Sequence, residues 1–313
     1  VRKEDNKVTL QIENLYRGKT GFDYRTNIEY TVAADGSILV NSTIIPSTKG
    51  VIIPRIGYRM ELPEGFERMR WYGRGPLENY VDRKDATYVG VYDELVSDQW
   101  VNYVRAQEMG NREDLRWISI TNPDGIGFVF IAGDKMSASA LHATAQDMVD
   151  SANHRRLLHK YEVPMRKETV LCLDANQRPL GNASCGPGPM QKYELRSQPT
   201  VFSFIILPLE RSYSTEELIR KARVQMPVCM PVLIERDNNG YLNLKTNTPG
   251  ATVHYSLNGG EEKIYTEPFE FISGGHVEAY AVSEQLGKSA GTSAEFPIYV
   301  DRSLWKIVSV SSE

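Results

Sequence analysis

Residues 71–83 read Trp-Tyr-Gly-Arg-Gly-Pro-Leu-Glu-Asn-Tyr-Val-Asp-Arg. Gly73, Gly75 and Pro76 predict a tight, irregular backbone in this segment. Carboxylates, an amide, arginine and two tyrosines are crowded onto it, and this mixture suits hydrogen bonding to polyols. A second dense run at residues 103–112 reads Tyr-Val-Arg-Ala-Gln-Glu-Met-Gly-Asn-Arg and continues as Glu-Asp-Leu-Arg-Trp to residue 117.

Both runs concentrate charged and amide side chains on loops that contain glycine or proline. Charged groups that are buried or half-buried need partners. We therefore expect six side chains to lie close together, to hydrogen-bond one another and to structure the loops near a site. They are Glu78, Asn79, Asp82, Glu108, Asn111 and Arg112.

The sequence around these runs is almost entirely of β type. Asp35-Gly36 predicts a hairpin turn, and Asn122-Pro-Asp-Gly125 predicts another. A single helix is expected over residues 214–224, because Ser214 and Glu217 form a capping box. Many strands with one short helix predict an all-β fold with two packed sheets. The expected strands are 24–32, 38–45, 56–62, 117–121, 126–132, 168–173, 192–195 and 201–209.

A second module is expected after an extended Pro-containing linker at residues 226–231. Thr-Pro-Gly at 248–250 starts a strand, Asn-Gly-Gly at 258–260 turns it back, and Val253, Tyr255 and Leu257 alternate toward one core. This pattern resembles the small immunoglobulin-like module at the C-termini of chitobiases and related glycosidases. The expected boundaries are 1–225 for the first domain and 226–300 for this module. Residues 301–313 are expected to be a linker or the start of a further module.

The composition excludes several classes of protein. The chain has 313 residues, a net charge of −4 and no basic field that would attract nucleic acid. No apolar run approaches the ~20 residues that a membrane helix needs. The three cysteines, Cys172, Cys185 and Cys229, have neither the number nor the spacing of a disulfide framework or a zinc cluster. The N-terminus is too polar for a signal peptide, so we expect the chain to start within a longer protein.

The two polar runs resemble hallmark strings of the C-terminal β-sandwich domain of large β-galactosidases of glycoside hydrolase family 2. For residues 1–225 the resemblance implies a large antiparallel super-sandwich, similar to galactose mutarotase and truncated at its N-terminal side. It implies a parent enzyme that hydrolyses terminal β-D-galactosides with retention. The partners implied are the catalytic barrel of the same polypeptide and the β-galactoside itself.

The resemblance also implies that the chemistry lies elsewhere. Retaining glycosidases need two carboxylates about 5 Å apart, and in this family both belong to a (β/α)₈ barrel. Nothing in this sequence alternates strands with helices of ten residues, so no catalytic residue is expected and the chain alone should be inactive. No cofactor is expected either, since the family's Mg and Na ions are bound mainly outside this region.

One loop could still contribute to a substrate site. Residues 177–188 align with a family loop in which a tryptophan stacks on sugar, but this chain has Cys185 at that position. The stacking platform is therefore expected to be lost, while Asn182 and Ser184 remain able to hydrogen-bond a hydroxyl. The substrate-binding candidates are Asn182, Ser184 and Cys185.

Two other functions remain open from the sequence alone. The first is a stand-alone carbohydrate-binding or adhesion protein built of β modules. The second is a mutarotase-like epimerase, which needs a histidine and a carboxylate as acid and base; His142, His154 and His159 are the histidines to consider. Appended β modules favour a periplasmic or extracellular parent, and unpaired cysteines leave the cytoplasm open.

Overall fold

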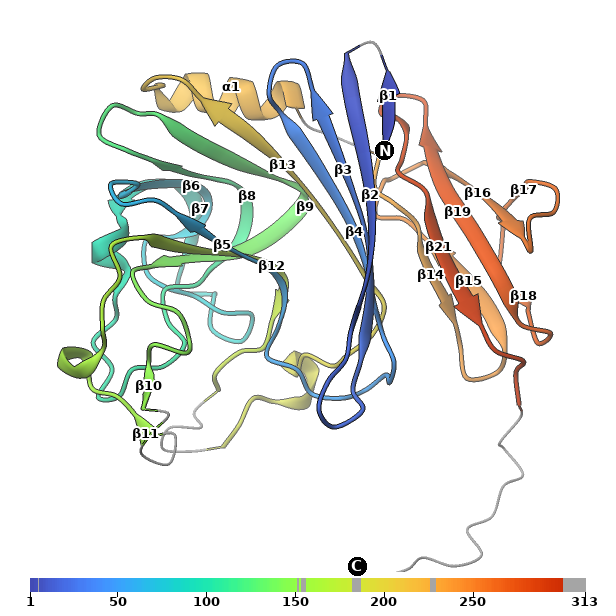
Figure 1. Ribbon diagram of the computed structural model, residues 1–313, viewed down its shortest axis with the longest axis horizontal. Coiled ribbons are helices and arrows are strands. Elements are labelled where there is room, and N and C mark those ends of the chain that lie inside the picture. Colours follow the sequence, from blue (N-terminus) through green and yellow to red (C-terminus); the bar gives the residue numbers. More distant parts are fainter. Residues whose placement is uncertain (5, 151, 153–155, 182–186, 226–228, 301–313) are drawn as a thin grey trace, which may run out of the picture. The chain divides into compact units, whose positions relative to one another are not determined.

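The structure is a computed structural model that describes residues 1–4, 6–150, 152, 156–181, 187–225 and 229–300. The chain divides into two compact units, residues 1–227 and residues 228–313. Figure 1 shows that both are built from β-strands, with the α-helix α1 (Thr215–Gln225) in the first unit. The prediction of an all-β fold built of antiparallel sheets is confirmed.

The first unit carries most of the regular structure. Its strands are β1 (Arg2–Glu4), β2 (Lys7–Tyr16), β3 (Tyr24–Ala33), β4 (Ile38–Pro46), β5 (Arg55–Leu62), β6 (Arg68–Gly75), β7 (Tyr88–Leu95), β8 (Arg112–Thr121), β9 (Gly127–Leu141), β10 (Val149–Asp150), β11 (Arg156–Leu157), β12 (Thr169–Gln177) and β13 (Thr200–Leu209). Its helices are the 3₁₀ turns η1 (Val96–Gln99), η2 (Lys160–Glu162) and η3 (Gln191–Tyr193) and the α-helix α1 (Thr215–Gln225).

Strand β9 joins the two sides of the main sheet. The strand order is β1-β2-β3-β4-β13-β9-β8-β6-β7, and β12 adds to β9 and carries β5. Residues 127–132 of β9 pair with β13, whereas residues 137–141 pair with β12. Because one long strand pairs with different neighbours along its length, the sheet curves over itself and encloses a core (Figure 1).

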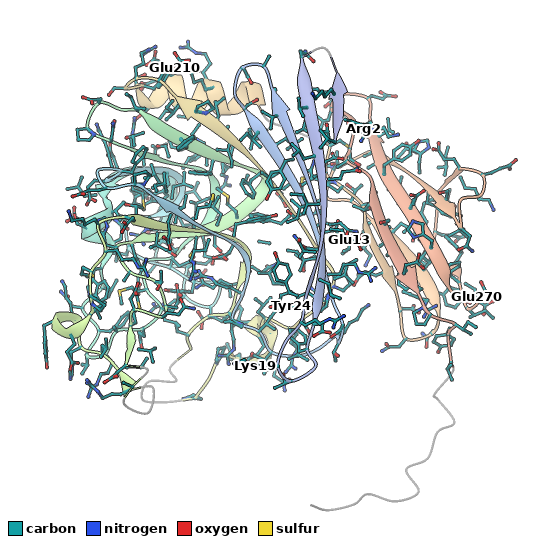
Figure 2. All side chains as sticks on the ribbon, in the orientation of Figure 1. Arg2, Glu13, Lys19, Tyr24, Glu210 and Glu270 are labelled. Atoms are coloured by element: carbon teal, nitrogen blue, oxygen red, sulfur yellow. The ribbon has the colours of Figure 1, made fainter. Side chains whose placement is uncertain are left out.

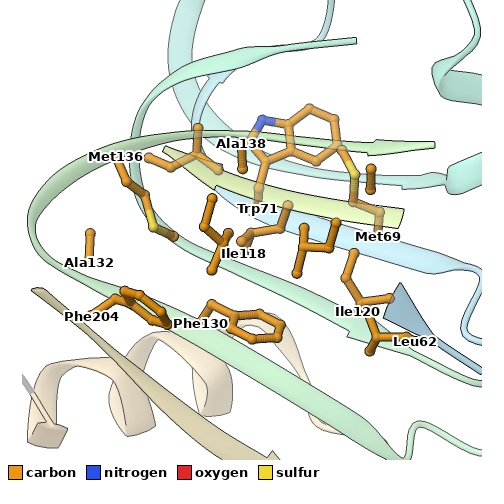
Figure 3. Close-up of a cluster of buried hydrophobic side chains, with 14 of the residues drawn as sticks. Leu62, Met69, Trp71, Ile118, Ile120, Phe130, Ala132, Met136, Ala138 and Phe204 are labelled. Atoms are coloured by element: carbon orange, nitrogen blue, oxygen red, sulfur yellow. The ribbon is translucent and has the colours of Figure 1, made fainter. Parts of the chain in front are cut away.

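The core is filled from several strands at once. Trp71 on β6, Ile118 on β8, Leu171 on β12 and Phe204 on β13 are each at most 1% exposed and belong to one cluster. Figure 3 shows Trp71 and Ile118 on one side of the cluster and Phe130 and Phe204 on the other. Burying side chains of this size contributes about 1.5–3 kcal/mol each, so the core supplies the main stabilisation of this unit.

Most local predictions agree with the structure. The turn at Asp35 and Gly36 joins β3 to β4, with Gly36 at φ +81°. The capping box also forms: Glu217 N–H donates to Ser214 Oγ at 3.2 Å, and Ser214 N–H donates to a Glu217 carboxylate oxygen at 2.7 Å. The strand expected at 192–195 is wrong, because residues 191–193 form η3 instead. There, the backbone N–H groups of Tyr193 and Glu194 donate within the turn and not to a neighbouring strand.

The second unit has two small sheets and its own core. Strands β14 (Leu233–Arg236), β15 (Tyr241–Lys245) and β18 (Phe269–Glu270) form one sheet; β16 (Thr252–Leu257), β17 (Lys263–Ile264), β19 (Gly275–Ser283), β20 (Gly287–Lys288) and β21 (Thr292–Phe296) form the other. Val253 is buried, and Tyr255 and Leu257 pack against the same core. The alternation predicted for this strand is thus present, while the identity of the unit as an immunoglobulin-like module stays a prediction.

Candidate functional site

The sheet brings the two motif loops to one end of adjacent strands. The loop at residues 76–87 joins β6 to β7, and the loop at residues 100–111 leads into β8. Since β6 pairs antiparallel with both β7 and β8, the C-terminal end of β6 lies beside the N-terminal end of β8. The topology therefore places both loops together, as the sequence predicts.

Two asparagines, Asn79 and Asn111, hydrogen-bond the two motif loops to each other. Asn79 N–H donates to the Asn111 carbonyl at 2.8 Å, and Asn111 Nδ2 donates back to the Asn79 carbonyl at 2.8 Å. Asn79 Oδ1 also accepts the backbone N–H of Glu113 at 2.8 Å. Both asparagines are completely buried. A buried reciprocal pair of this kind holds the two loops at fixed separation.

Glu78 anchors a second set of bonds between the same loops. One carboxylate oxygen accepts the backbone N–H of Gly110 at 2.8 Å. The other accepts Arg83 Nη2 at 2.6 Å and the hydroxyl of Tyr103. With three donors, the Glu78 carboxylate is held as an acceptor, and Arg83 covers the ring of Tyr80 at 4.8 Å.

Arg112 is the most deeply placed charge of the cluster. Its guanidinium lies 5.0 Å from the centre of the Trp71 ring and donates to the carbonyls of Gly110 and Asn111. It also donates to Gln99 Oε1 at 2.6 Å. Burial lowers the pKa of Arg112 from its usual value, although Glu94 opposes the shift. This arginine joins the loop to the core.

A bulge at the start of β8 shapes the site. The register between β8 and β9 shifts on either side of Leu115, and Asp114 takes a left-handed φ of 56°. Burial acts to raise the pKa of Asp114, but hydrogen bonds from Arg74 and Lys84 outweigh it and lower the pKa. Bulges redirect side chains in this way beside functional sites.

Gly73 corrects one expectation from the sequence. It lies inside regular strand β6 and not in an irregular loop. A Cβ atom there would come within 2.9 Å of the Leu115 Cα, so close packing against β8 explains why a side chain does not fit. The irregular backbone begins after Gly75.

Glu108 lies in a neighbouring charge cluster. Arg55 on β5 contacts Glu108 at 3.6 Å and Asp174 on β12 at 2.8 Å. Burial raises the pKa of Asp174 to about 7, against the effect of Arg55. Burial also raises the pKa of the Cys172 thiol to about 11. The sequence interpretation missed Arg55 and Asp174, because the strand pairing that joins them spans more than a hundred residues.

The predicted substrate-binding residues Asn182, Ser184 and Cys185 lie outside the described residues. The described start of that loop does meet the first motif loop, because Gly181 N–H donates to Asp82 Oδ2 at 3.3 Å. All six predicted loop-structuring residues are described. Asn79, Asn111 and Arg112 hydrogen-bond one another, whereas Glu78 is held by Gly110, Arg83 and Tyr103 and not by another of the six. Asp82 accepts a hydrogen bond from Gly181, and Glu108 contacts Arg55.

The two described histidines of the first unit, His142 and His159, are hydrogen-bonded to distant parts of the same unit. His142 bonds Glu67 at 2.7 Å and the Glu168 carbonyl at 3.0 Å, and His159 bonds the Val104 carbonyl at 2.7 Å. His154 lies outside the described residues. Within the described ranges, no group of three His, Cys, Asp or Glu side chains could hold a metal ion.

Comparison with known proteins identifies the family of this chain. A family described as "Beta galactosidase small chain" matches residues 1–206. A β-galactosidase of Arthrobacter sp. strain B7 is 32% identical over 212 residues, covering 62% of this chain and 20% of the relative. A β-galactosidase of Bifidobacterium adolescentis is 31% identical, covering 61% of this chain and 18% of the relative. A β-galactosidase of Priestia megaterium is 39% identical, covering 33% of this chain and 10% of the relative.

The chain spans about a fifth or less of the length of these curated relatives. Among solved structures, a protein of Escherichia coli K12 titled provisionally as an aldose 1-epimerase aligns with 67% of both chains at a TM-score of 0.33 and 11% identity. A likeness this weak carries no argument. The family match, in contrast, covers well over half of the chain and includes both motif loops. This chain belongs to the β-galactosidase small-chain family.

Proposed function

We propose that this chain is the non-catalytic C-terminal portion of a β-galactosidase that hydrolyses terminal β-D-galactosides with retention. The observation that carries the proposal is the family match over residues 1–206. It is supported by the names of the curated relatives, which are β-galactosidases. Neither a stand-alone binding protein nor an epimerase is favoured by these findings.

The carboxylates of the site support a structural role. Glu78 accepts three hydrogen bonds, Glu113 accepts one from Asn111, and Asp174 is paired with Arg55. A general acid and a nucleophile need to face a shared substrate about 5 Å apart. Carboxylates held by protein donors instead stiffen the loops that carry them. The chain's part in the enzyme is then to present rigid loops.

The catalytic barrel of the same polypeptide is the proposed partner, and a β-galactoside is the proposed substrate of the whole. Any direct contact from this chain to sugar is assigned to the loop that contains Asn182, Ser184 and Cys185. The contact is weak, because Cys185 provides no ring to stack on a pyranose. The Mg and Na ions used by the family belong mainly to the rest of the enzyme.

In the part of the chain that the structure describes, no helix is long and apolar enough to cross a membrane. The appended second unit favours a periplasmic or extracellular enzyme. Fractionation of the source cells, followed by detection of this chain with an antibody, tests that compartment.

The function is tested by turnover. Purified chain from a host without its own β-galactosidase is incubated with nitrophenyl β-galactoside, and no hydrolysis above the uncatalysed rate is expected. Robust turnover would overturn the assignment as a non-catalytic portion. Reading the coding sequence upstream of Val1 provides the second test, since the proposal requires a (β/α)₈ barrel with two catalytic glutamates in the same frame.

A further inference from the structure

One edge of strand β5 has no neighbouring strand in the part of the chain that the structure describes. β5 pairs antiparallel with β12, and the order of the sheet gives it no second partner. In an antiparallel pair, alternate residues direct their backbone groups toward the partner, and the residues between them direct theirs away. About half of the backbone N–H and C=O groups of β5 therefore point away from β12, and an edge of this kind can pair with a further strand.

A cavity of about 290 Å³ lies along this free edge. Five consecutive residues of β5, residues 55–59, line it. Consecutive side chains of a strand point to opposite faces, so a cavity that touches all five meets the edge of the strand and not one of its faces. Because β12 occupies the other edge of β5, the cavity lies at the unpaired one.

A second wall of the cavity is one face of the sheet formed by β2, β3 and β4. β3 contributes Tyr24, Thr26 and Ile28, and β4 contributes Ile44 and Pro46. These are alternate residues of each strand, and alternate residues share a face. Figure 2 shows Tyr24 at the lower end of these strands. The cavity therefore separates a strand edge from a sheet face.

This sheet face is apolar and only partly covered. Tyr16 on β2 lines the cavity and is 52% exposed, and its cross-strand partner Tyr24 is 38% exposed. The exposed face continues along β2 to Ile12, which pairs with Ile28 and is 41% exposed. An apolar sheet face is stable when another element packs on it. An occupant of the cavity would extend that cover over β2 and β3.

The two walls require different groups from an occupant. The edge of β5 offers backbone donors and acceptors, whereas the face of β2, β3 and β4 offers apolar surface. The two arginines of the wall donate to side chains of the first unit, Arg55 to Asp174 and Arg59 to Gln146. An extended segment with apolar residues at alternate positions meets both requirements, because its backbone pairs with β5 while one row of its side chains packs on the sheet face.

The size of the cavity favours a single strand over a second copy of this chain. An apolar cavity of about 150 Å³ holds benzene, so 290 Å³ has room for about two apolar side chains of that size. A second copy would bring its own β5, whose inner face already packs on its own core through Tyr58, Met60 and Leu62. The chain spans about a fifth or less of its curated relatives, so the proposed parent enzyme has most of its length outside residues 1–313.

We propose that an extended segment of the parent enzyme, from outside residues 1–313, pairs with the free edge of β5. Its apolar side chains, at alternate positions, pack against the sheet face that carries Tyr16, Tyr24 and Ile28. The source of this segment rests on the proposed function, whereas its chemistry rests on the free edge and the cavity.

The test uses the full 313-residue chain and a synthetic peptide in which valine and threonine alternate, with two lysines at each end for solubility. Binding of the dye-labelled peptide is followed by fluorescence anisotropy and should saturate at one site per chain. A peptide of the same composition with its valines adjacent should bind about tenfold more weakly, because it cannot present one apolar row to the sheet face.

Two N-methylated peptides test the strand pairing directly. One carries methyl groups on the valine amides and the other carries them on the threonine amides. A strand directs the N–H groups of alternate residues toward one neighbour, so one of these peptides should lose binding and the other should keep it. The amides of β5 that point away from β12 should also exchange more slowly when the unmodified peptide is bound.

Tyr16→Lys and Leu15→Lys are a matched pair of variants. Both residues are 52% exposed and adjacent on β2, but they point to opposite faces, and of the two Tyr16 lines the cavity. Tyr16→Lys should weaken the alternating peptide about tenfold, whereas Leu15→Lys should leave its affinity unchanged. Circular dichroism checks that both variants are folded.

Several results would overturn this docking while the proposed function stands. They are no saturable binding of the alternating peptide, the same affinity for the two N-methylated peptides, or equal weakening by the two variants. A dimer of the chain alone that Tyr16→Lys dissociates, measured by analytical ultracentrifugation, would make the occupant a second copy and would also refute the proposal. A coding sequence without a catalytic barrel would instead overturn the proposed function, and with it the source of the segment.

Discussion

Replacing Asn79 with alanine should weaken the hydrogen bonding that holds the two motif loops together and so destabilise the first unit. The Asn79 side chain makes two hydrogen bonds, from Nδ2 to the Leu77 carbonyl at 2.9 Å and from the Glu113 N–H to Oδ1 at 2.8 Å. Each contributes about 1 kcal/mol, and the Glu113 N–H is left without its acceptor at a further cost. We expect a loss of about 2–4 kcal/mol, which lowers Tm by roughly 5–15 °C in a unit of this size.

The measurement is urea unfolding followed by tryptophan fluorescence, because the buried Trp71 and Trp117 both report on the first unit. Hydrogen exchange at the Glu113 amide gives a local readout, and its protection should fall in Asn79→Ala. Asn102→Ala is the matched control: Asn102 lies in the second loop, is exposed and only accepts a hydrogen bond from Lys160 at 3.1 Å. It should cost less than about 0.5 kcal/mol.

Asn79→Asp separates hydrogen bonding from packing. The new carboxyl has the shape of the amide but lies in a buried place beside Glu113, whose pKa is already raised by burial. The pKa of the introduced acid should also be raised in the folded state, so its neutral form is favoured at low pH and stability is lost as the pH rises. The variant should therefore approach wild type near pH 4 and be weakest near pH 8. Equal stability of Asn79→Ala and Asn102→Ala would refute the reasoning.

Three other predictions concern the rest of the first unit. The folded pKa of Asp174, about 7, lies above that of an unfolded aspartate, so the contribution of Asp174 to stability is present at low pH and is lost as the pH rises through 7. In urea titrations, the stability of wild type relative to Asp174→Asn should therefore fall by up to roughly 4 kcal/mol between pH 4 and 8. A difference that stays constant with pH would contradict this. Ile118→Ala should cost about 2–5 kcal/mol in the same assay, whereas Ile126→Ala, at a 46% exposed position of the same unit, should cost little. Cys172 is buried with a raised pKa, so iodoacetamide should label it only after unfolding, and peptide mass spectrometry that finds rapid labelling of the native chain would disprove this.

Features that depend on neighbouring residues could be predicted from the sequence. The Asp35-Gly36 hairpin and the Ser214–Glu217 capping box each depend on a few adjacent residues, and both form where expected. The all-β class follows from alternating apolar residues, which any strand with one buried face requires. Because buried charges need partners, the polar runs also predicted that Glu78, Asn79, Asp82, Glu108, Asn111 and Arg112 would hydrogen-bond one another. Asn79, Asn111 and Arg112 do so, whereas the three carboxylates are held by other partners.

Features that depend on distant strand pairing were decided only by the tertiary structure. Arg55 meets Asp174 because β5 pairs with β12, and no local pattern in either strand indicates that neighbour. In place of the strand expected at 192–195, residues 191–193 form a 3₁₀ turn, and only Leu195 and Arg196 after it pair, with Ile53 and Ile52. Gly73 is glycine because β8 passes too close for a side chain. Sequence determines what a segment prefers, whereas contacts between distant segments depend on how the whole chain packs.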